Sequence, residues 1–254
     1  MTTAATVPPA YRLVARDAVE STNDEAKRLA EAGAEEGTLV WARMQRQGRG
    51  RHGRVWLSPP GNLYLSLVLR PDCAPRHAGE LAFVAALGVA GAIGALMPPM
   101  SELAFKWPND VLLNDRKVAG ILLESALRGR ERLDWLVLGL GLNVALVPEG
   151  LGEGATSLVA EGGGGVTVED ALAAFGRHFL SWVRRWVDDG FAPVRNAWLH
   201  HAKGIGETVT VTVADSTVEG RLVEIDETGA LVLALAEGER CVITAGEVML
   251  GSPS

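Results

Sequence analysis

A loop rich in glycine and arginine, held between two strand-forming segments, constrains the fold of this chain most strongly. Residues 48–54 read GRGRHGR; residues 38–44 (TLVWARM) precede this loop and residues 62–69 (NLYLSLVL) follow it. Both flanking segments are rich in residues that favour strands, and the turn sequence SPPG at 58–61 bounds the second one. The loop is therefore expected to be held at both ends by a sheet.

The composition of this loop favours an anionic ligand. Glycine lets the backbone come close to a bound molecule, and arginine offers a planar, charged fork that suits carboxylate and phosphate groups. The loop has almost nothing apolar to bury, so we expect it to be disordered when empty and to become ordered around an anion. A basic solvated turn or a nucleic-acid patch has a similar composition, and these seven residues alone leave that alternative open.

The overall charge argues against a nucleic-acid partner. The chain has 254 residues and a formal net charge of −7, so no global basic field attracts nucleic acid. Its two cysteines, Cys73 and Cys241, lack metal-ligand spacing and fit a reducing compartment. No signal peptide is recognisable, and the apolar run at 81–96 is too short and too rich in alanine and glycine for a membrane span. A cytoplasmic protein without a membrane partner is expected.

Mixed strand and helix segments extend from residue 11 to about residue 204. The helix that follows Ser21-Thr22-Asn23 is expected to end near Gly33, and the simplest interpretation of this polar cluster is a helix cap. Residues 1–10 are expected to form a disordered tail. The expected strands are 11–18, 38–44, 62–69, 103–107, 111–113, 117–124 and 135–144, and the expected helices are 21–33, 77–96, 168–187 and 191–201.

The pattern changes after residue 207. Four short alternating segments, 208–213, 219–225, 231–235 and 240–244, are separated by turn sequences. They predict a small β-barrel of about fifty residues, close to the lower size limit for an independent domain. The domain boundaries are accordingly placed at 11–204 for the larger domain and 205–254 for the smaller one.

Two glycines interrupt a very apolar strand at 135–144. Gly139 and Gly141 are two residues apart and therefore lie on one face of that strand. A strand face without side chains lets a flat ligand lie against the sheet, but it also permits tight packing of a helix. The sequence leaves both interpretations open.

Five motifs in a fixed order resemble biotin protein ligase, and the resemblance covers about residues 11–249. They are Ser21-Thr22-Asn23, the GRGRHGR loop with Trp56, KWPND at 106–110, RKVAGILLE at 116–124, and GLGLN at 139–143. The resemblance implies a mixed-sheet α/β catalytic domain followed by a small SH3-like barrel. Some members of the family carry an N-terminal winged helix that binds DNA. Only about ten residues precede Tyr11 here, so we expect no such module and no DNA partner.

The resemblance also implies a two-step reaction. Biotin and ATP form biotinyl-5′-AMP and pyrophosphate, and a lysine of a biotin carboxyl carrier protein then takes the biotinyl group. Mg²⁺ is implied with ATP, and no metal site built from protein groups alone is expected because phosphates and water hold most of its coordination sphere. The enzyme is expected to be a monomer or a homodimer.

The resemblance assigns site residues by their positions in these motifs. The expected biotin-binding residues are Ser21, Thr22, Asn23, Gln45, Gly48, Arg49, Arg51, Lys117, Gly120, Gly139 and Gly141. The expected ATP and adenylate contacts are Arg49, Arg51, Arg54, Trp56, Lys117 and Asn143. The expected catalytic residues are Lys117, Arg51, Asp110 and Lys106; for Lys106 and Asp110, catalysis and scaffolding both stay open.

Three alternatives remain at this stage: an inactive scaffold, which would release no pyrophosphate with biotin and ATP, and two rival functions. A lipoate ligase or octanoyltransferase shares the fold and the acyl-to-lysine chemistry, but the GRGRHGR loop and the KWPND turn argue against it. A nucleic-acid-binding module could use the basic loop, and the net charge of −7 argues against that.

Overall fold

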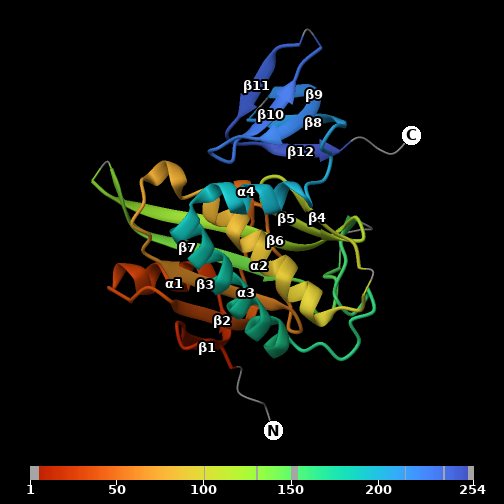
Figure 1. Ribbon diagram of the computed structural model, residues 1–254. Coiled ribbons are helices and arrows are strands. Elements are labelled where there is room, and N and C mark those ends of the chain that lie inside the picture. Colours follow the sequence, from red (N-terminus) through yellow and green to blue (C-terminus); the bar gives the residue numbers. More distant parts are fainter. Residues whose placement is uncertain are drawn as a thin grey trace.

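A mixed sheet forms the centre of the larger part of the molecule (Figure 1). The computed structural model describes residues 6–99, 101–129, 131–149, 154–214, 216–236 and 238–250. Within this part of the chain the sheet has seven strands in the order β1-β2-β3-β7-β6-β5-β4, and only β1 and β2 are parallel. The strands are β1 (Arg12–Val19), β2 (Thr38–Gln45), β3 (Leu63–Leu69), β4 (Leu103–Lys106), β5 (Asp110–Leu113), β6 (Arg116–Arg128) and β7 (Arg132–Leu142).

The two faces of this sheet are covered differently. Helices α2 (Glu80–Leu96), α3 (Val168–Asp189) and α4 (Phe191–Leu199) pack together and bury the main apolar core against one face. Helix α1 (Thr22–Glu31) covers part of the other face through a small apolar cluster that includes Ala26, Val68 and Val137. Because side chains alternate along a strand, the leucines of β3 face the main core while Ser66 faces α1.

Helix α2 is the central helix of the core. The segment Pro75–Leu96 is long and apolar enough to span a membrane by length and composition, and 61% of its 18-residue apolar window is buried inside the protein. It lies against α3, α4 and strands of the sheet, where Val84, Val89 and Ile93 are fully buried. Its apolar composition therefore serves the core.

A second, smaller sheet follows α4 (Figure 1, top). In the described residues it has five antiparallel strands in the order β11-β10-β9-β8-β12. They are β8 (Thr208–Val213), β9 (Ser216–Ile225), β10 (Leu231–Ala234), β11 (Arg240–Ile243) and β12 (Glu247–Leu250). The expected all-β domain is confirmed, but the prediction of four strands was wrong. It missed β12, whose four residues give too short an alternation to recognise, although β12 pairs with β8.

Polar and aromatic contacts hold the small sheet against the larger domain. Trp107 Nε1 donates to the Gly229 carbonyl at 3.0 Å, and Arg195 Nε donates to the Ile225 carbonyl at 2.6 Å. Gly229 has φ of +83°, and a Cβ there would lie 2.7 Å from the ring of Phe83. This turn must therefore be glycine both for its backbone and for its approach to α2.

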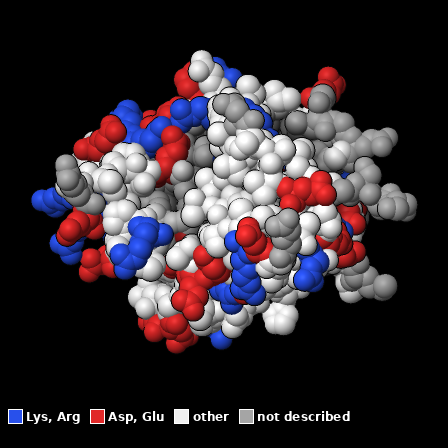
Figure 2. All heavy atoms as spheres, turned by 90° about the horizontal axis from the view of Figure 1, so that it is seen from above, with Lys and Arg blue, Asp and Glu red and all other residues white. Residues whose placement is uncertain are grey.

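The surface seen from above carries no large patch of one charge sign. Figure 2 shows basic and acidic side chains interspersed around a broad uncharged area on that face. The acidic net charge of −7 is thus accompanied by mixed charges on this side of the molecule.

Candidate active site

A cavity of about 290 Å³ lies on the face of the large sheet that α1 covers only in part. Most of the residues expected from the sequence line it, and they come from α1, the end of β2, the loop after β2, β6 and β7. The expected residues at its wall are Ser21, Thr22, Asn23, Gln45, Arg49, Arg51, Arg54, Trp56, Lys117, Gly120, Gly139, Gly141 and Asn143. Motifs as far apart as Ser21 and Asn143 are brought together because α1, β6 and β7 meet at this face.

Three expected residues do not line this cavity. Gly48 faces the base of the loop instead: its carbonyl accepts from the Trp56 amide at 2.9 Å, and a Cβ there would lie 2.5 Å from Ser58 Oγ. Lys106 and Asp110 face each other across the β4–β5 pair. Asp110 still contacts the site, because its Oδ1 lies 2.6 Å from Lys117 Nζ.

Three glycines in the lining of the cavity let other side chains lie close to the sheet. Gly120 of β6 pairs with Gly141 of β7, and the Cβ positions of both are occupied by the indole of Trp56, which lies 3.0 Å and 2.4 Å away. A Cβ on Gly139 would lie 2.1 Å from Asn23 Oδ1. At Gly139 the alternative of tight packing by a helix is confirmed, because Asn23 belongs to α1, whereas at Gly141 the flat ring of Trp56 lies against the strand. Any larger residue at these positions would displace Asn23 or Trp56.

The first turn of α1 does not cap its own helix as expected. Ser21 occupies the N-cap position with φ of −148°, but its side chain makes no capping hydrogen bond. Thr22 instead contacts Gln45 Oε1, through its amide at 2.8 Å and its hydroxyl at 3.0 Å. Asn23 is 4% exposed and turns into the sheet. The simple interpretation as a cap was wrong, because these side chains build the wall of the cavity.

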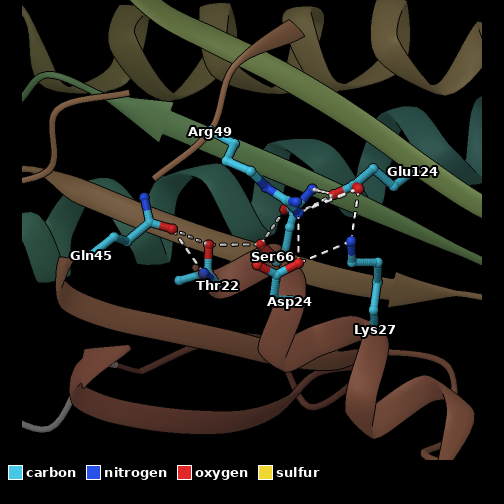
Figure 3. A network of polar contacts seen from close by, with 8 residues as sticks. Thr22, Asp24, Lys27, Gln45, Arg49, Ser66 and Glu124 are labelled. Carbon is cyan, nitrogen blue, oxygen red and sulfur yellow. Dashed lines mark hydrogen bonds and ion pairs between the residues drawn. The ribbon is translucent and has the colours of Figure 1, made fainter. Parts of the chain in front are cut away.

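Ser66 and Glu124 complete a polar network behind that wall (Figure 3). Ser66 is fully buried, and its hydroxyl lies 2.8 Å from Thr22 Oγ1 and 2.6 Å from Asn23 Oδ1. Glu124 Oε2 accepts from Asn23 Nδ2 at 2.7 Å. Sequence reasoning assigned no role to either residue, although a single serine inside NLYLSLVL is a signal that could have been used.

Each arginine of the loop meets a group of the protein. Arg49 Nη2 donates to Asp24 Oδ1 at 2.6 Å and lies 3.3 Å from Glu124 Oε2 (Figure 3). Between these residues and Lys27, two acids and two bases form a balanced cluster beside the cavity. The cation that the resemblance assigns to the ligand's anion is therefore paired with carboxylates of the protein.

The other two arginines reach the small C-terminal domain. Arg51 Nη1 lies 3.0 Å from the Gly246 carbonyl and 3.4 Å from Asn109 Oδ1, and burial lowers the pKa of its guanidinium. Arg54 Nη1 forms an ion pair with Glu247 Oε1 at 2.7 Å. Burial raises the pKa of Glu247, but Arg54 and more distant lysines outweigh it and hold this pKa below its ordinary value. Sequence reasoning missed Glu247 because it lies in the unrecognised strand β12.

Lys117 and Trp56 form the centre of the cationic side. Lys117 Nζ lies 5.4 Å from the centre of the Trp56 ring, over its face, and pairs with Asp110. Trp56 Nε1 is buried, with no hydrogen-bond partner in the described part of the chain. This ring thus lies between the lysine and the strand glycines Gly120 and Gly141 without a polar contact of its own.

Asn143 also lines the cavity, and both ends of its side-chain amide contact other groups of the protein. Its Nδ2 donates to the Thr156 carbonyl at 3.0 Å, and its Oδ1 lies 3.3 Å from Asn62 Nδ2. Asn62 Oδ1 in turn accepts from the amide of Val144 at 2.9 Å. The expected adenine contact of Asn143 stays a prediction, and Asn62 is a supporting residue that the sequence motifs did not reveal.

Known proteins match both parts of the chain. A model of the biotin/lipoate A/B protein ligase family matches residues 7–200, and a model of the biotin protein ligase C-terminal domain matches residues 204–251. A biotin–[acetyl-CoA-carboxylase] ligase from Paracoccus denitrificans is 43% identical over 237 residues, which are 91% of this chain and 98% of that protein. A protein of the same name from Mycobacterium tuberculosis is 34% identical, over 90% of this chain and 85% of that protein.

Solved structures agree with the sequence matches. The biotin protein ligase from Aquifex aeolicus in complex with biotin and ATP superposes with a TM-score of 0.79 at 29% identity, over 94% of this chain and 97% of that one. This chain belongs to the biotin/lipoate A/B protein ligase family and carries the C-terminal domain of a biotin protein ligase. The resemblance seen in the five motifs is thereby confirmed.

Proposed function

We propose that this protein activates biotin with Mg·ATP to biotinyl-5′-AMP and transfers the biotinyl group to a lysine of a biotin carboxyl carrier protein. One observation carries the proposal: the lining of a single cavity combines the uncharged hydrogen-bonding groups of Thr22 and Gln45 with the cationic groups of Arg49, Arg51 and Lys117. Biotin carries the complementary groups, a neutral ureido ring at one end and a carboxylate at the other.

The ureido ring binds beside Thr22 and Gln45. Gln45 is held by two contacts from Thr22 and by its own Nε2, which donates to Ser58 Oγ at 2.9 Å. Such prior fixation reduces the conformational entropy that ligand binding would otherwise cost. Gly139 and Gly141 let Asn23 and Trp56 lie close to the sheet, and the bicyclic ring binds beside these two side chains.

The first chemical step joins two anions. A carboxylate oxygen of biotin attacks the α-phosphorus of ATP, the bond to the β-phosphate oxygen breaks, and pyrophosphate leaves with that electron pair. Lys117 and Arg51 offset the repulsion and stabilise the charge that builds up in the transition state. In the structure Lys117 Nζ forms an ion pair with Asp110 at 2.6 Å. In the proposed step Lys117 leaves Asp110 and contacts the α-phosphate. Mg²⁺ enters with ATP as part of the substrate.

The second step forms an amide bond. The uncharged amine of the carrier lysine attacks the carbonyl carbon of the mixed anhydride, the bond to the phosphate oxygen breaks and AMP leaves. The amine must lose protons, and Asp110 is the carboxylate placed to orient or accept one once Lys117 has moved to the phosphate. The Gly/Arg loop covers the intermediate against water meanwhile.

Three further properties belong to this proposal. The catalytic domain covers residues 11–204 and the SH3-like domain covers residues 205–254, as the sequence pattern suggests. The enzyme acts in the cytoplasm as a monomer or homodimer, and no nucleic acid takes part. Disorder of the empty loop also stays a prediction.

Release of pyrophosphate tests the first step. The protein should release pyrophosphate only when biotin and Mg·ATP are both present, and lipoate should not replace biotin. A thermal-shift series with the same ligands separates the rival family member. Stabilisation by lipoate with ATP, but not by biotin with ATP, would assign the site to lipoate instead.

A further inference from the structure

We propose that Asp24 and Glu124 compete with the carboxylate of biotin for Arg49 and thereby lower the affinity of the empty site for biotin. The inference rests on the proposed function, because it takes the ligand to be a carboxylate that reaches Arg49. Its structural basis is the pairing in Figure 3, where Arg49 Nη2 lies 2.6 Å from Asp24 Oδ1 and 3.3 Å from Glu124 Oε2.

The two acids are fixed by partners outside the loop. Glu124 accepts from Asn23 Nδ2 at 2.7 Å and from Lys27 Nζ at 2.8 Å, and Lys27 also pairs with Asp24 at 2.9 Å. Burial lowers the pKa of Lys27, but its contacts with Glu124 and Asp24 outweigh this and raise that pKa, so Lys27 stays charged. Both acids therefore keep a cation when Arg49 leaves.

Arg49 is the partner that can move. It lies between Gly48 and Gly50, and 39% of its side chain is exposed. The acids, by contrast, come from the first turn of α1 and from strand β6, where Glu124 pairs with Val137 of β7. An exchange of ion pairs at this point thus moves the loop and leaves the walls of the cavity in place.

The arrangement makes the ligand a competitor of the two acids. Arg49 already has two carboxylates around one guanidinium, and a third carboxylate at the same group would meet like charges at short range. Biotin therefore binds Arg49 by taking it from Asp24 and Glu124. A biotin derivative without a negative charge does not compete with the two acids for Arg49. Asp24 and Glu124 therefore lower the affinity for biotin but not the affinity for such a derivative.

Calorimetric titration of the Asp24→Asn protein tests this competition. Asp24 is 46% exposed, and asparagine has nearly the same shape, so the substitution removes the charge and keeps the fold, which a melting curve verifies. Exposed ion pairs are weak, so biotin should bind about two- to fivefold more tightly than to the parent. Biotin methyl ester should bind both proteins equally.

The matched control is Asp17→Asn. It removes the same charge from the same domain at a fully exposed side chain whose ion pair, with Arg43, has a separation of 3.7 Å. It should leave both affinities unchanged. In an Arg49→Ala background the effect of Asp24→Asn should disappear, which attributes it to this pair.

Three results would overturn the inference. They are an unchanged or weaker affinity for biotin in Asp24→Asn, an equal gain for biotin and its ester, or the same gain in the Arg49→Ala background. A parent protein that binds no biotin would instead refute the proposed function, so the two failures can be told apart.

Discussion

Replacement of Ser66 by alanine should weaken both the fold and the binding of biotin. The hydroxyl of Ser66 is fully buried and is the hydrogen-bond donor to Asn23 Oδ1 at 2.6 Å. Its removal leaves that oxygen without this partner in a site where only 4% of Asn23 is exposed. A buried polar atom that loses its partner costs about 1–3 kcal/mol of unfolding free energy.

This cost can be followed in two assays. For a protein of this size, about 1 kcal/mol corresponds to about 2–4 °C, so the melting temperature should fall by about 2–12 °C. The KM for biotin should rise about three- to tenfold, since the wall residues Thr22 and Asn23 lose the contact that orients them. The KM for ATP should change less than about twofold, because no phosphate contact of the proposal passes through Ser66.

The control for Ser66→Ala is Ser125→Ala, which changes an exposed serine on β6. It should alter neither the melting temperature nor the two KM values. A Ser66→Ala protein that loses stability but keeps its KM for biotin would show that the network only supports the fold. Equal increases of both KM values would also refute the account, since the effect would then not be confined to the biotin end.

Three other perturbations follow from the same geometry. Lys117→Ala should mainly slow adenylate formation in single-turnover assays. Arg51→Ala should instead release biotinyl-AMP early and label lysines indiscriminately. An Arg51→Ala protein that retains biotinyl-AMP as tightly as the parent would refute the covering role of Arg51. Trp107→Phe removes the donor to the buried Gly229 carbonyl, so the melting temperature should fall by an amount corresponding to about 1–3 kcal/mol; an unchanged melting curve would refute this docking contact. Burial raises the pKa of Glu161, but its hydrogen bonds and a nearby arginine outweigh this effect and hold that pKa below the ordinary value of 4.5. The contribution of Glu161 to the stability of the fold is therefore present above pH 4.5 and is lost as pH falls through the lowered pKa. The Glu161→Gln protein should therefore lose less stability than the parent below pH 4.5 in denaturant titrations, and parallel losses would contradict this.

Much of the fold could be predicted from local pattern. The strands that flank the Gly/Arg loop, and the helix that became α3, are evident because their apolar periodicity is long and their turns are marked. Strand β12 was missed, since four residues after a turn contain too little periodicity to distinguish a strand from a tail. The failure to predict β12 affected the description of the site, because this strand brings Glu247 to Arg54.

The sequence predicted which residues belong to the candidate site, but not which groups those residues contact. Motif order gave Thr22, Gln45 and the loop arginines, because each belongs to a recognisable segment. Which group each arginine meets depends on strand register and on the approach of α1 to β6, and neither is encoded in any local window. Ser66 belongs to the same class of residue: it is unremarkable within its strand and gains a role only from what lies across the sheet face.

The loop is also more connected than its composition implied. A segment with nothing apolar to bury is expected to be disordered without ligand, which stays a prediction, and its composition alone suggests no contacts with the rest of the chain. Its arginines instead meet acids or carbonyls from α1, β6 and the small domain. These contacts arise from residues far away in sequence, so the loop's own composition gave no sign of them.

Mass spectrometry of a biotin carboxyl carrier fragment tests the central claim most directly. After incubation with the protein, biotin and Mg·ATP, the fragment should gain one biotinyl group on a single lysine. The gain should be absent without ATP and strongly reduced with the Lys117→Ala protein. A fragment that stays unmodified with the folded parent protein, or one that gains a lipoyl group from lipoate and ATP in its place, would contradict the account.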